Sequence, residues 1–245
     1  LASKLSSDRQ VELELLELYL IDKNLLLVEK YIDSLLAKDP DNPDTLFKIA
    51  NLLHERSLYN LSEKYLSYIV TENDRVNILR GLNDYMLGNY IESISHFKRV
   101  NDFNYKIMAH VNISSSLNKF YGLEKSFDYL ESIKKNYQDK NIQLNLNLKQ
   151  ISLLNEYDKF YDVIEYCTNL LEDDPYLTNI LYARAMAYEN IEKIDLMEQD
   201  LRKILSIDRK NANTLNALGY SLVIHTKRYD EAYSLLYKAY QFDPG

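Results

Sequence analysis

The feature that most constrains the fold of this chain is a pattern of small and apolar residues that returns about every 34 residues. In the last segment, Ala232, Leu236, Ala239 and Pro244 stand at offsets of 0, 4, 7 and 12. The first three offsets carry small or apolar residues in six earlier segments. The first positions of the segments, at steps of 34, 31, 33, 37, 34 and 35 residues, are Val28, Ser62, Ser93, Ser126, Val163, Met197 and Ala232. A regular step of this length predicts a stack of similar supersecondary units.

Each unit contains two helical patterns. In the sixth, Leu181, Ala185 and Tyr188 follow the spacing i, i+4, i+7, and the same spacing returns from Met197. The stretches 38–44, 172–176 and 207–213 between units contain Asp or Asn, which can cap the next helix. No run alternates as a strand does, and the chain has only 5 Gly and 4 Pro. The sequence therefore predicts an all-α fold.

These units resemble the tetratricopeptide repeat, a helix–turn–helix of about 34 residues. The last unit carries the family's order of large, small and proline positions in Leu215, Leu218, Gly219, Leu222, Ala232, Leu236, Ala239 and Pro244. The second, third and sixth units carry much of it, whereas the first and fourth depart from it. The resemblance implies a right-handed superhelical solenoid of about seven repeats, one domain over residues 1–245. The expected repeats are 8–40, 43–74, 75–103, 104–138, 142–175, 178–209 and 212–245.

The glycine of the last unit has a predicted packing role. Gly219 and Ala232 stand where the two helices of that unit are expected to cross closely, so a side chain larger than methyl would push them apart. Glycine inside a helix costs about 1 kcal/mol relative to alanine, and close backbone approach is a reason for it to be there.

The resemblance also implies a partner-binding groove, because the first helix of each tetratricopeptide unit lines the concave face of the solenoid. Four positions of that helix, counted from the small crossing residue, face the groove. The candidate residues at these positions are Phe47, Asn51, His54, Tyr85, Asn145, Asn155, Asn179, Tyr182, Met186, Asn213, Asn216 and Tyr220.

Two groups of candidates have more than one interpretation. Asn145, Asn179 and Asn213 repeat at steps of 34, so they are expected to form a row whose amides could bind a peptide backbone. Alternatively, they cap helix starts. The aromatic candidates offer contact area typical of binding patches, but in a chain with 22 tyrosines they could equally be packing residues.

Several function classes lack their signals. The formal net charge of −8 and the absence of a long basic stripe argue against nucleic acid. No run of 18 apolar residues is present to span a membrane. Cys167, the single cysteine, occupies a core position and is expected to be inert; His54 has no second histidine at the spacing of a zinc helix. We therefore expect no enzyme activity, no cofactor and no metal site.

The predicted function is a non-catalytic scaffold or adaptor that holds a protein or peptide partner in the groove. The last two units also resemble those of bacterial outer-membrane-associated tetratricopeptide lipoproteins. This implies a periplasmic adaptor with a lipid anchor outside these residues. An intracellular regulatory or assembly module of a larger protein, an enzyme whose catalytic domain lies outside these residues and a self-associating repeat element are the alternatives.

The last helical pattern lacks the polar outer face expected of a terminal repeat. Only Asp230, Ser234, Lys238 and Gln241 form a polar stripe, and tyrosines and aliphatic residues occupy most other positions. The sequence also begins at Leu1 rather than Met. We therefore expect a fragment of a longer chain, which either continues with further repeats or docks through this helix on another copy.

Overall fold

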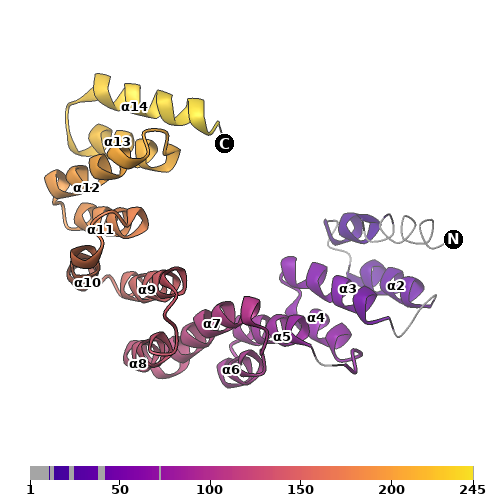
Figure 1. The fold of residues 1–245 in the computed structure, drawn as a ribbon. Helices are drawn as coiled ribbons and strands as arrows, with labels where there is room; N and C mark the ends of the chain where they lie inside the picture. Colours follow the sequence, from indigo (N-terminus) through magenta and orange to yellow (C-terminus); the bar gives the residue numbers. More distant parts are fainter. Residues whose placement is uncertain (1–10, 12–13, 22–24, 38–41, 72, 245) are drawn as a thin grey trace. The chain divides into compact units, whose positions relative to one another are not determined.

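A computed structural model describes residues 11, 14–21, 25–37, 42–71 and 73–244, which contain helices and no strand (Figure 1). Residues 14–21 are helical. The following helices are α2 (Leu25–Leu36), α3 (Pro43–Glu55), α4 (Tyr59–Leu66), α5 (Asp74–Leu87), α6 (Tyr90–Lys98), α7 (Phe103–Tyr121), α8 (Leu123–Lys134), α9 (Lys140–Asn155), α10 (Phe160–Asp173), α11 (Thr178–Asn190), α12 (Ile194–Ile207), α13 (Ala212–His225) and α14 (Tyr229–Phe242). The all-α prediction is confirmed.

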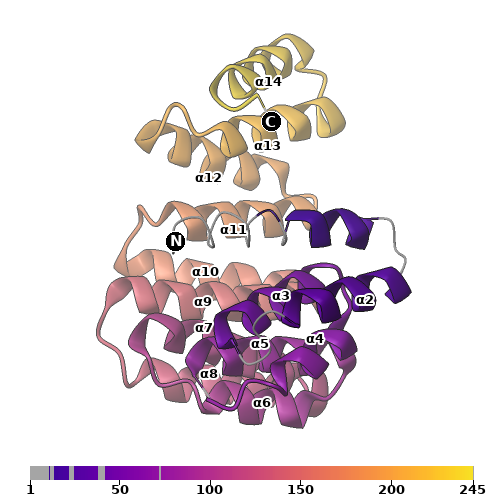
Figure 2. The same cartoon turned by 90° about the vertical axis from the view of Figure 1, so that its right-hand side faces the viewer.

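The helices group into two compact units, Leu1–Ile133 and Lys134–Gly245. In unit 1, α3 pairs with α4 and α5 with α6; in unit 2, α9 pairs with α10, α11 with α12 and α13 with α14. Each pair is one predicted helix–turn–helix, so the odd-numbered helices are the first helices of the repeats and the even-numbered ones the second. In Figure 2, the helices of unit 2 follow one another as layers from α9 to α14.

Several helices begin at the capping signals of the sequence. The side chains of Asn42 and Asn211 accept hydrogen bonds from the third backbone amide after them, at 3.0 and 2.9 Å. The stretch 172–176 behaves differently from the prediction. Asp174 accepts from the amide of Tyr176 within the turn, and α11 starts after Leu177, whose side chain makes no capping bond.

Unit 1 joins its paired helices with a repeated polar contact. The serine at the first position of the pattern donates to the backbone carbonyl twelve residues earlier, in the first helix of the same repeat. Ser62 donates to Ala50 at 2.8 Å, Ser93 to Gly81 at 2.8 Å and Ser126 to the Ser114 carbonyl at 2.7 Å. All three serines are fully buried. A buried hydroxyl needs a hydrogen-bond partner, and the carbonyl provides one. Serine can therefore occupy the position at which the last repeat has alanine.

The predicted close crossing in the last repeat is confirmed. A methyl group on Gly219 would lie 2.8 Å from Cγ of Leu236 and 3.1 Å from the carbonyl oxygen of Ala232. Gly81 holds the same place between α5 and α6, where a methyl group would lie 2.8 Å from the ring of Phe97. Both glycines are buried inside helices, so close approach explains them.

Unit 2 contains a buried ion pair that ties three consecutive helices together. Arg184 of α11 binds both carboxylate oxygens of Asp200 on α12 at 2.8 Å and the hydroxyl of Thr168 on α10 at 3.0 Å. Asp200 is only 5% exposed, so the bidentate guanidinium satisfies a carboxylate that water barely reaches.

In the described part of the chain, no helix has both the length and the apolar character to cross a bilayer.

Candidate partner-binding surfaces

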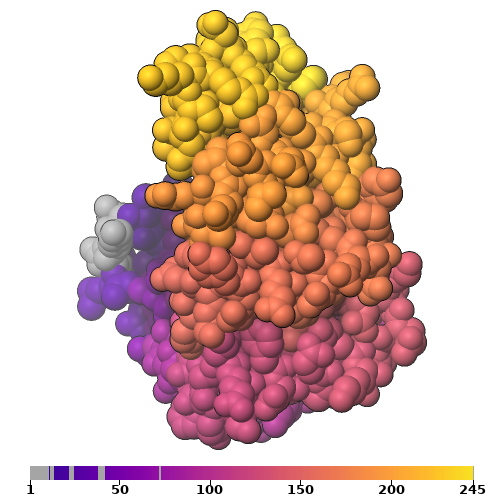
Figure 3. All heavy atoms as spheres, turned by 90° about the vertical axis from the view of Figure 1, so that its left-hand side faces the viewer, coloured from indigo at the N-terminus to yellow at the C-terminus, as the bar shows by residue number. Residues whose placement is uncertain are grey.

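The first helices of unit 2, α9, α11 and α13, lie along one side of that unit, opposite α10 and α12 (Figure 1). Figure 3 views unit 2 from the side of α10 and α12. Most candidate groove residues of this unit are exposed: Asn145, Asn155, Asn179, Asn213, Asn216 and Tyr220. Tyr182 and Met186 are half-buried, and Tyr220 is 61% exposed. We call these eight residues the amide–tyrosine face; their role in binding stays a prediction.

The capping interpretation of the asparagine row is wrong. The cap of α9 is Asp139, which accepts from two backbone amides at 2.8 and 3.1 Å, and the cap of α13 is Asn211. Asn145 instead lies inside α9 and donates to the carbonyl of Asn141 at 2.9 Å. Asn179 and Asn213 follow the first residues of α11 and α13. All three amides are therefore displayed on the helix surfaces rather than used to start the helices.

A carboxylate lies beside this face between α11 and α13. Glu189 accepts from the hydroxyl of Ser221 and lies 3.5 Å from Nε2 of His225. Burial, together with the charge of Glu189, raises the pKa of the Tyr182 phenol. The eight residues of the amide–tyrosine face are thus neutral, and the carboxylate of Glu189 beside them is negative. Sequence reasoning missed Ser221 and His225 because neither occupies a predicted groove position.

The four candidates in unit 1 contact their own neighbours. The Phe47 ring lies under the Arg75 guanidinium at 4.3 Å, and Tyr85 packs edge-on against Tyr90 at 5.6 Å between ring centroids. Asn51 donates to Glu55 at 2.6 Å. These contacts hold the side chains in place while leaving each residue half-buried.

The imidazole of His54 belongs to a buried hydrogen-bond network. Its Nδ1 lies 2.8 Å from Oδ1 of Asn83, and the Asn83 amide donates to the Ser62 hydroxyl at 2.9 Å. Asn83 and Ser62 are fully buried. The ring also meets Tyr59 edge-on at 5.3 Å. This imidazole therefore has a structural part in unit 1, and its predicted part in binding is untested.

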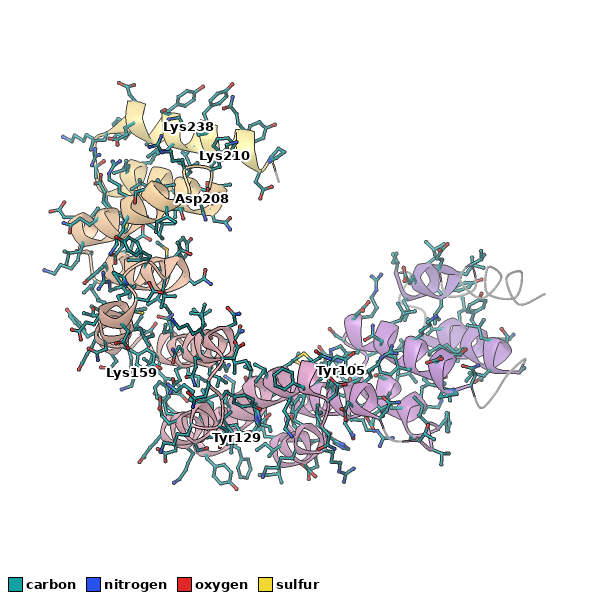
Figure 4. The ribbon with its side chains drawn as sticks, in the orientation of Figure 1. Tyr105, Tyr129, Lys159, Asp208, Lys210 and Lys238 are labelled. Carbon is teal, nitrogen blue, oxygen red and sulfur yellow. The ribbon has the colours of Figure 1, made fainter. Side chains whose placement is uncertain are left out.

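A second surface lies on α14. Its large exposed residues are Tyr229 (60%), Tyr233 (71%), Tyr237 (52%), Tyr240 (64%) and Phe242 (45%). The rings of Tyr233 and Tyr237 are stacked, 6.1 Å apart and 12° from parallel. Lys210 lies 5.8 Å from the Phe242 ring, and Lys238 belongs to the polar stripe of the same helix (Figure 4). The predicted lack of a polar outer face is confirmed.

Cys167 has the environment of an inert thiol. It is fully buried, and burial raises its pKa to about 12. A thiol with this pKa holds almost no thiolate at neutral pH, and the thiolate is the nucleophile. Among the described residues, no group of three or more His, Cys, Asp or Glu side chains could hold a metal ion.

Comparisons with known proteins agree with this geometry. The family model of the tetratricopeptide repeat matches residues 178–211, which span α11, α12 and the turns beside them. A TPR repeat-containing protein of Pseudomonas aeruginosa, PA4667, is 29% identical over 153 residues, which are 62% of this chain. The chain thus contains a tetratricopeptide repeat at residues 178–211 and is similar to a TPR repeat-containing protein. It spans about a quarter of the length of that relative, 25%.

Two solved structures are also similar to the chain. MamA 41-end from Desulfovibrio magneticus RS-1 is 10% identical with a TM-score of 0.47, covering 71% of this chain and 97% of that one. YrrB, described as a TPR protein with an unusual peptide-binding site, is 13% identical with a TM-score of 0.43, covering 86% and 92%.

Proposed function

We propose that this chain is a non-catalytic scaffold that binds an extended segment of a protein partner on the amide–tyrosine face. The observation that carries the proposal is the display of asparagine amides at equivalent positions of α9, α11 and α13, with tyrosines on the same side of α11 and α13. Amides pair with the donors and acceptors of a peptide backbone, and tyrosine adds contact area with a hydroxyl. The repeated step of the units matches a partner that lies across several of them.

The electrostatics of the face favour one class of partner segment. Glu189 is the charged group whose carboxylate acts on Tyr182, and the candidates of the amide–tyrosine face are neutral. An acidic segment would meet like charge, whereas a neutral or basic segment with apolar side chains would not. We therefore propose a segment without Asp or Glu where it crosses α11 and α13.

The test is affinity capture from a lysate of the source organism with three baits. The first is the unchanged chain, and the second carries Asn179→Ala, Tyr182→Ala and Tyr220→Ala. The third is a matched control with Asn169→Ala, Tyr161→Ala and Tyr176→Ala, the same residue types at positions that are exposed elsewhere in unit 2. Circular dichroism establishes that all three fold.

We expect the unchanged and control baits to enrich the same partner and the face variant to lose it. Truncating one central contact residue costs about 1–2 kcal/mol, so three should weaken binding by roughly a hundred-fold or more. If all three baits capture the same proteins, or none captures any, the amide–tyrosine face is not the binding site.

The cellular setting is a further part of the proposal. The resemblance of the last two units to bacterial lipoproteins supports a lipid-tethered adaptor in the periplasm. The alternative is an intracellular module of a larger protein. Fractionation of cells producing the complete gene product tests this, since a protein released with the cytoplasm would contradict the periplasmic setting.

Self-association through α14 is the second candidate function. It is supported by the several large aromatic side chains exposed on that helix, because single exposed apolar residues are common on protein surfaces whereas groups of them mark interaction sites.

A further inference from the structure

One carboxylate of unit 2 lacks the arginine partner that comparable carboxylates of that unit have. Glu198 and Glu231, whose side chains are 16% and 38% exposed, bind Arg228 at 2.7 and 2.6 Å. The side chain of Glu189 on α11 is 26% exposed, but among the described residues it forms no ion pair with a lysine or an arginine. A half-buried carboxylate without a counter-ion costs folding free energy. Glu189 therefore does not stabilise the fold in the way that the other two do.

The contacts of Glu189 leave one of its two carboxylate oxygens available. Ser221 on α13 donates its hydroxyl to Oε1, and Nε2 of His225 lies 3.5 Å from the same oxygen, which is too long for a hydrogen bond. Within the described part of the chain, Oε2 has no donor, and it is open to solvent. The carboxylate is thus held between α11 and α13 with one oxygen ready to accept from a ligand.

The place of Glu189 within α11 also favours a cation. Glu189 is the next-to-last residue of that helix, whose last turn contains no basic residue. The carbonyl end of a helix carries partial negative charge, which stabilises a cation and destabilises a carboxylate. A positive group bound here would be attracted by the helix end and by Glu189 together.

Two apolar side chains lead along α11 to this carboxylate. Tyr182, Met186 and Glu189 follow one another at i, i+4 and i+7, so they lie on one side of the helix, and all three are half-buried. At the helical rise per residue, this stripe is about 10 Å long. The ring and the thioether offer apolar area, and the negative charge lies at one end. The matching ligand has an apolar stem with a positive end.

We propose that Glu189 binds a basic side chain of the partner segment, an arginine or a lysine whose stem lies along Met186 and Tyr182. The guanidinium or ammonium group donates to Oε2, and its aliphatic carbons cover the apolar part of the stripe. The inference rests on the proposed binding at the amide–tyrosine face and adds the residue that selects the partner's sequence. Amides such as Asn179 can bind a backbone of any sequence, whereas Glu189 requires a cation where the segment crosses α11.

Selection from a phage-displayed library of random peptides tests this, because it needs no known partner. The baits are the unchanged chain, Glu189→Gln, Glu189→Lys and the triple variant of the amide–tyrosine face. Glu165→Gln is the matched control, since it removes the same charge from an exposed position of α10. The amide oxygen of glutamine can still accept from Ser221, so Glu189→Gln keeps that contact, and circular dichroism checks the folding of every bait.

We expect the unchanged and control chains to select peptides with Arg or Lys at one fixed position. Glu189→Gln should lose this preference, and Glu189→Lys should select Asp or Glu at that position instead. If Glu189 only held Ser221 and His225 in place, these substitutions would not exchange one preference for the other.

A selected peptide, synthesised with blocked ends so that its basic side chain supplies the cation, then tests the contact directly. Fluorescence anisotropy should show about ten-fold weaker binding to Glu189→Gln than to the unchanged chain. Replacing the basic residue of the peptide by glutamine should weaken binding to the unchanged chain by the same factor. It should have no further effect on Glu189→Gln, because the two groups contact each other.

The outcomes that overturn this inference differ from those that overturn the proposed function. If the selected peptides fail to bind the triple variant but show no preference for Arg or Lys, or keep that preference with Glu189→Gln, the face binds a partner and Glu189 does not select it. If no peptide is selected, or if the peptides bind the triple variant as well as the unchanged chain, the proposed function fails and this inference fails with it.

Discussion

Replacing Gly81 by alanine tests the close crossing of α5 and α6. The added methyl group would lie 2.8–2.9 Å from three ring carbons of Phe97. The ring is 1% exposed and packs in a cluster with Ile94 and Val100, so it cannot turn into solvent. The Gly81 carbonyl also accepts the Ser93 hydroxyl, which resists separation of the two helices.

Two opposing effects set the magnitude. Overpacking a filled site costs about 1–3 kcal/mol, while alanine inside a helix gains about 1 kcal/mol over glycine. We therefore expect Gly81→Ala to lower the free energy of unfolding by about 0–2 kcal/mol. In a Phe97→Leu background the ring carbons are gone, so the same change should raise it by up to about 1 kcal/mol. The coupling energy between the two positions should be about 1–3 kcal/mol.

The assay is urea unfolding of the unchanged chain, both single variants and the double variant, followed by circular dichroism. Repeat proteins can unfold in more than one step, so native-state hydrogen exchange of the α5 and α6 amides gives the local value. The reasoning is refuted if Gly81→Ala stabilises the chain with Phe97 present, or has the same effect in both backgrounds.

Two further predictions concern buried polar groups. Ser126→Ala removes one hydrogen bond and should cost about 0.5–1.5 kcal/mol, whereas Ser62→Ala also leaves the buried Asn83 amide without its acceptor and should cost about 1–3 kcal/mol in urea unfolding; equal costs would contradict the role given to Asn83. For Cys167, burial raises the thiol pKa from 9.0 to about 12, so the stability it contributes is full below pH 9 and falls as pH rises toward 12, by up to about 1.4 kcal/mol per pH unit. A Cys167→Ala chain should lose less stability than the unchanged chain between neutral pH and pH 11, and parallel curves would count against this.

The repeat architecture could be read from the sequence because its signals are local. The spacing of small residues places Gly219 and Ala232 at a crossing, and the structure has that crossing. The capping asparagines Asn42 and Asn211 also stand beside prolines, lysines or other turn residues that identify them. Such signals depend only on the residue and its immediate neighbours, so they can be recognised in the sequence without knowledge of the fold.

The candidate site was less predictable because its features depend on register. Asn145, Asn179 and Asn213 lie near helix starts, but a cap is decided by a shift of a few residues, and Asp139 and Asn211 hold those places. The bond between His54 and Asn83 joins residues 29 apart in different repeats, so nothing adjacent in the sequence indicates it. The pairing of Arg184 with Asp200 could not be predicted from the sequence either, since the repeat pattern has a large apolar residue at the position of Arg184.

The contrast between α12 and α14 concerns how charge sets the register of neighbouring repeats. Glu198 binds Arg228, and Arg202 binds Glu231, so α12 accepts α14 only in the register that pairs opposite charges. Exposed ion pairs add little stability, about 0–1 kcal/mol each, but a shifted register would place like charges together. Tyr233 and Tyr237 have no charge that selects a register. The strength of a contact made by these rings comes from buried apolar area, which any aliphatic surface can match. Charge therefore helps to set the register of α12 against α14 within the chain, and no equivalent selection by charge operates at the exposed tyrosines of α14.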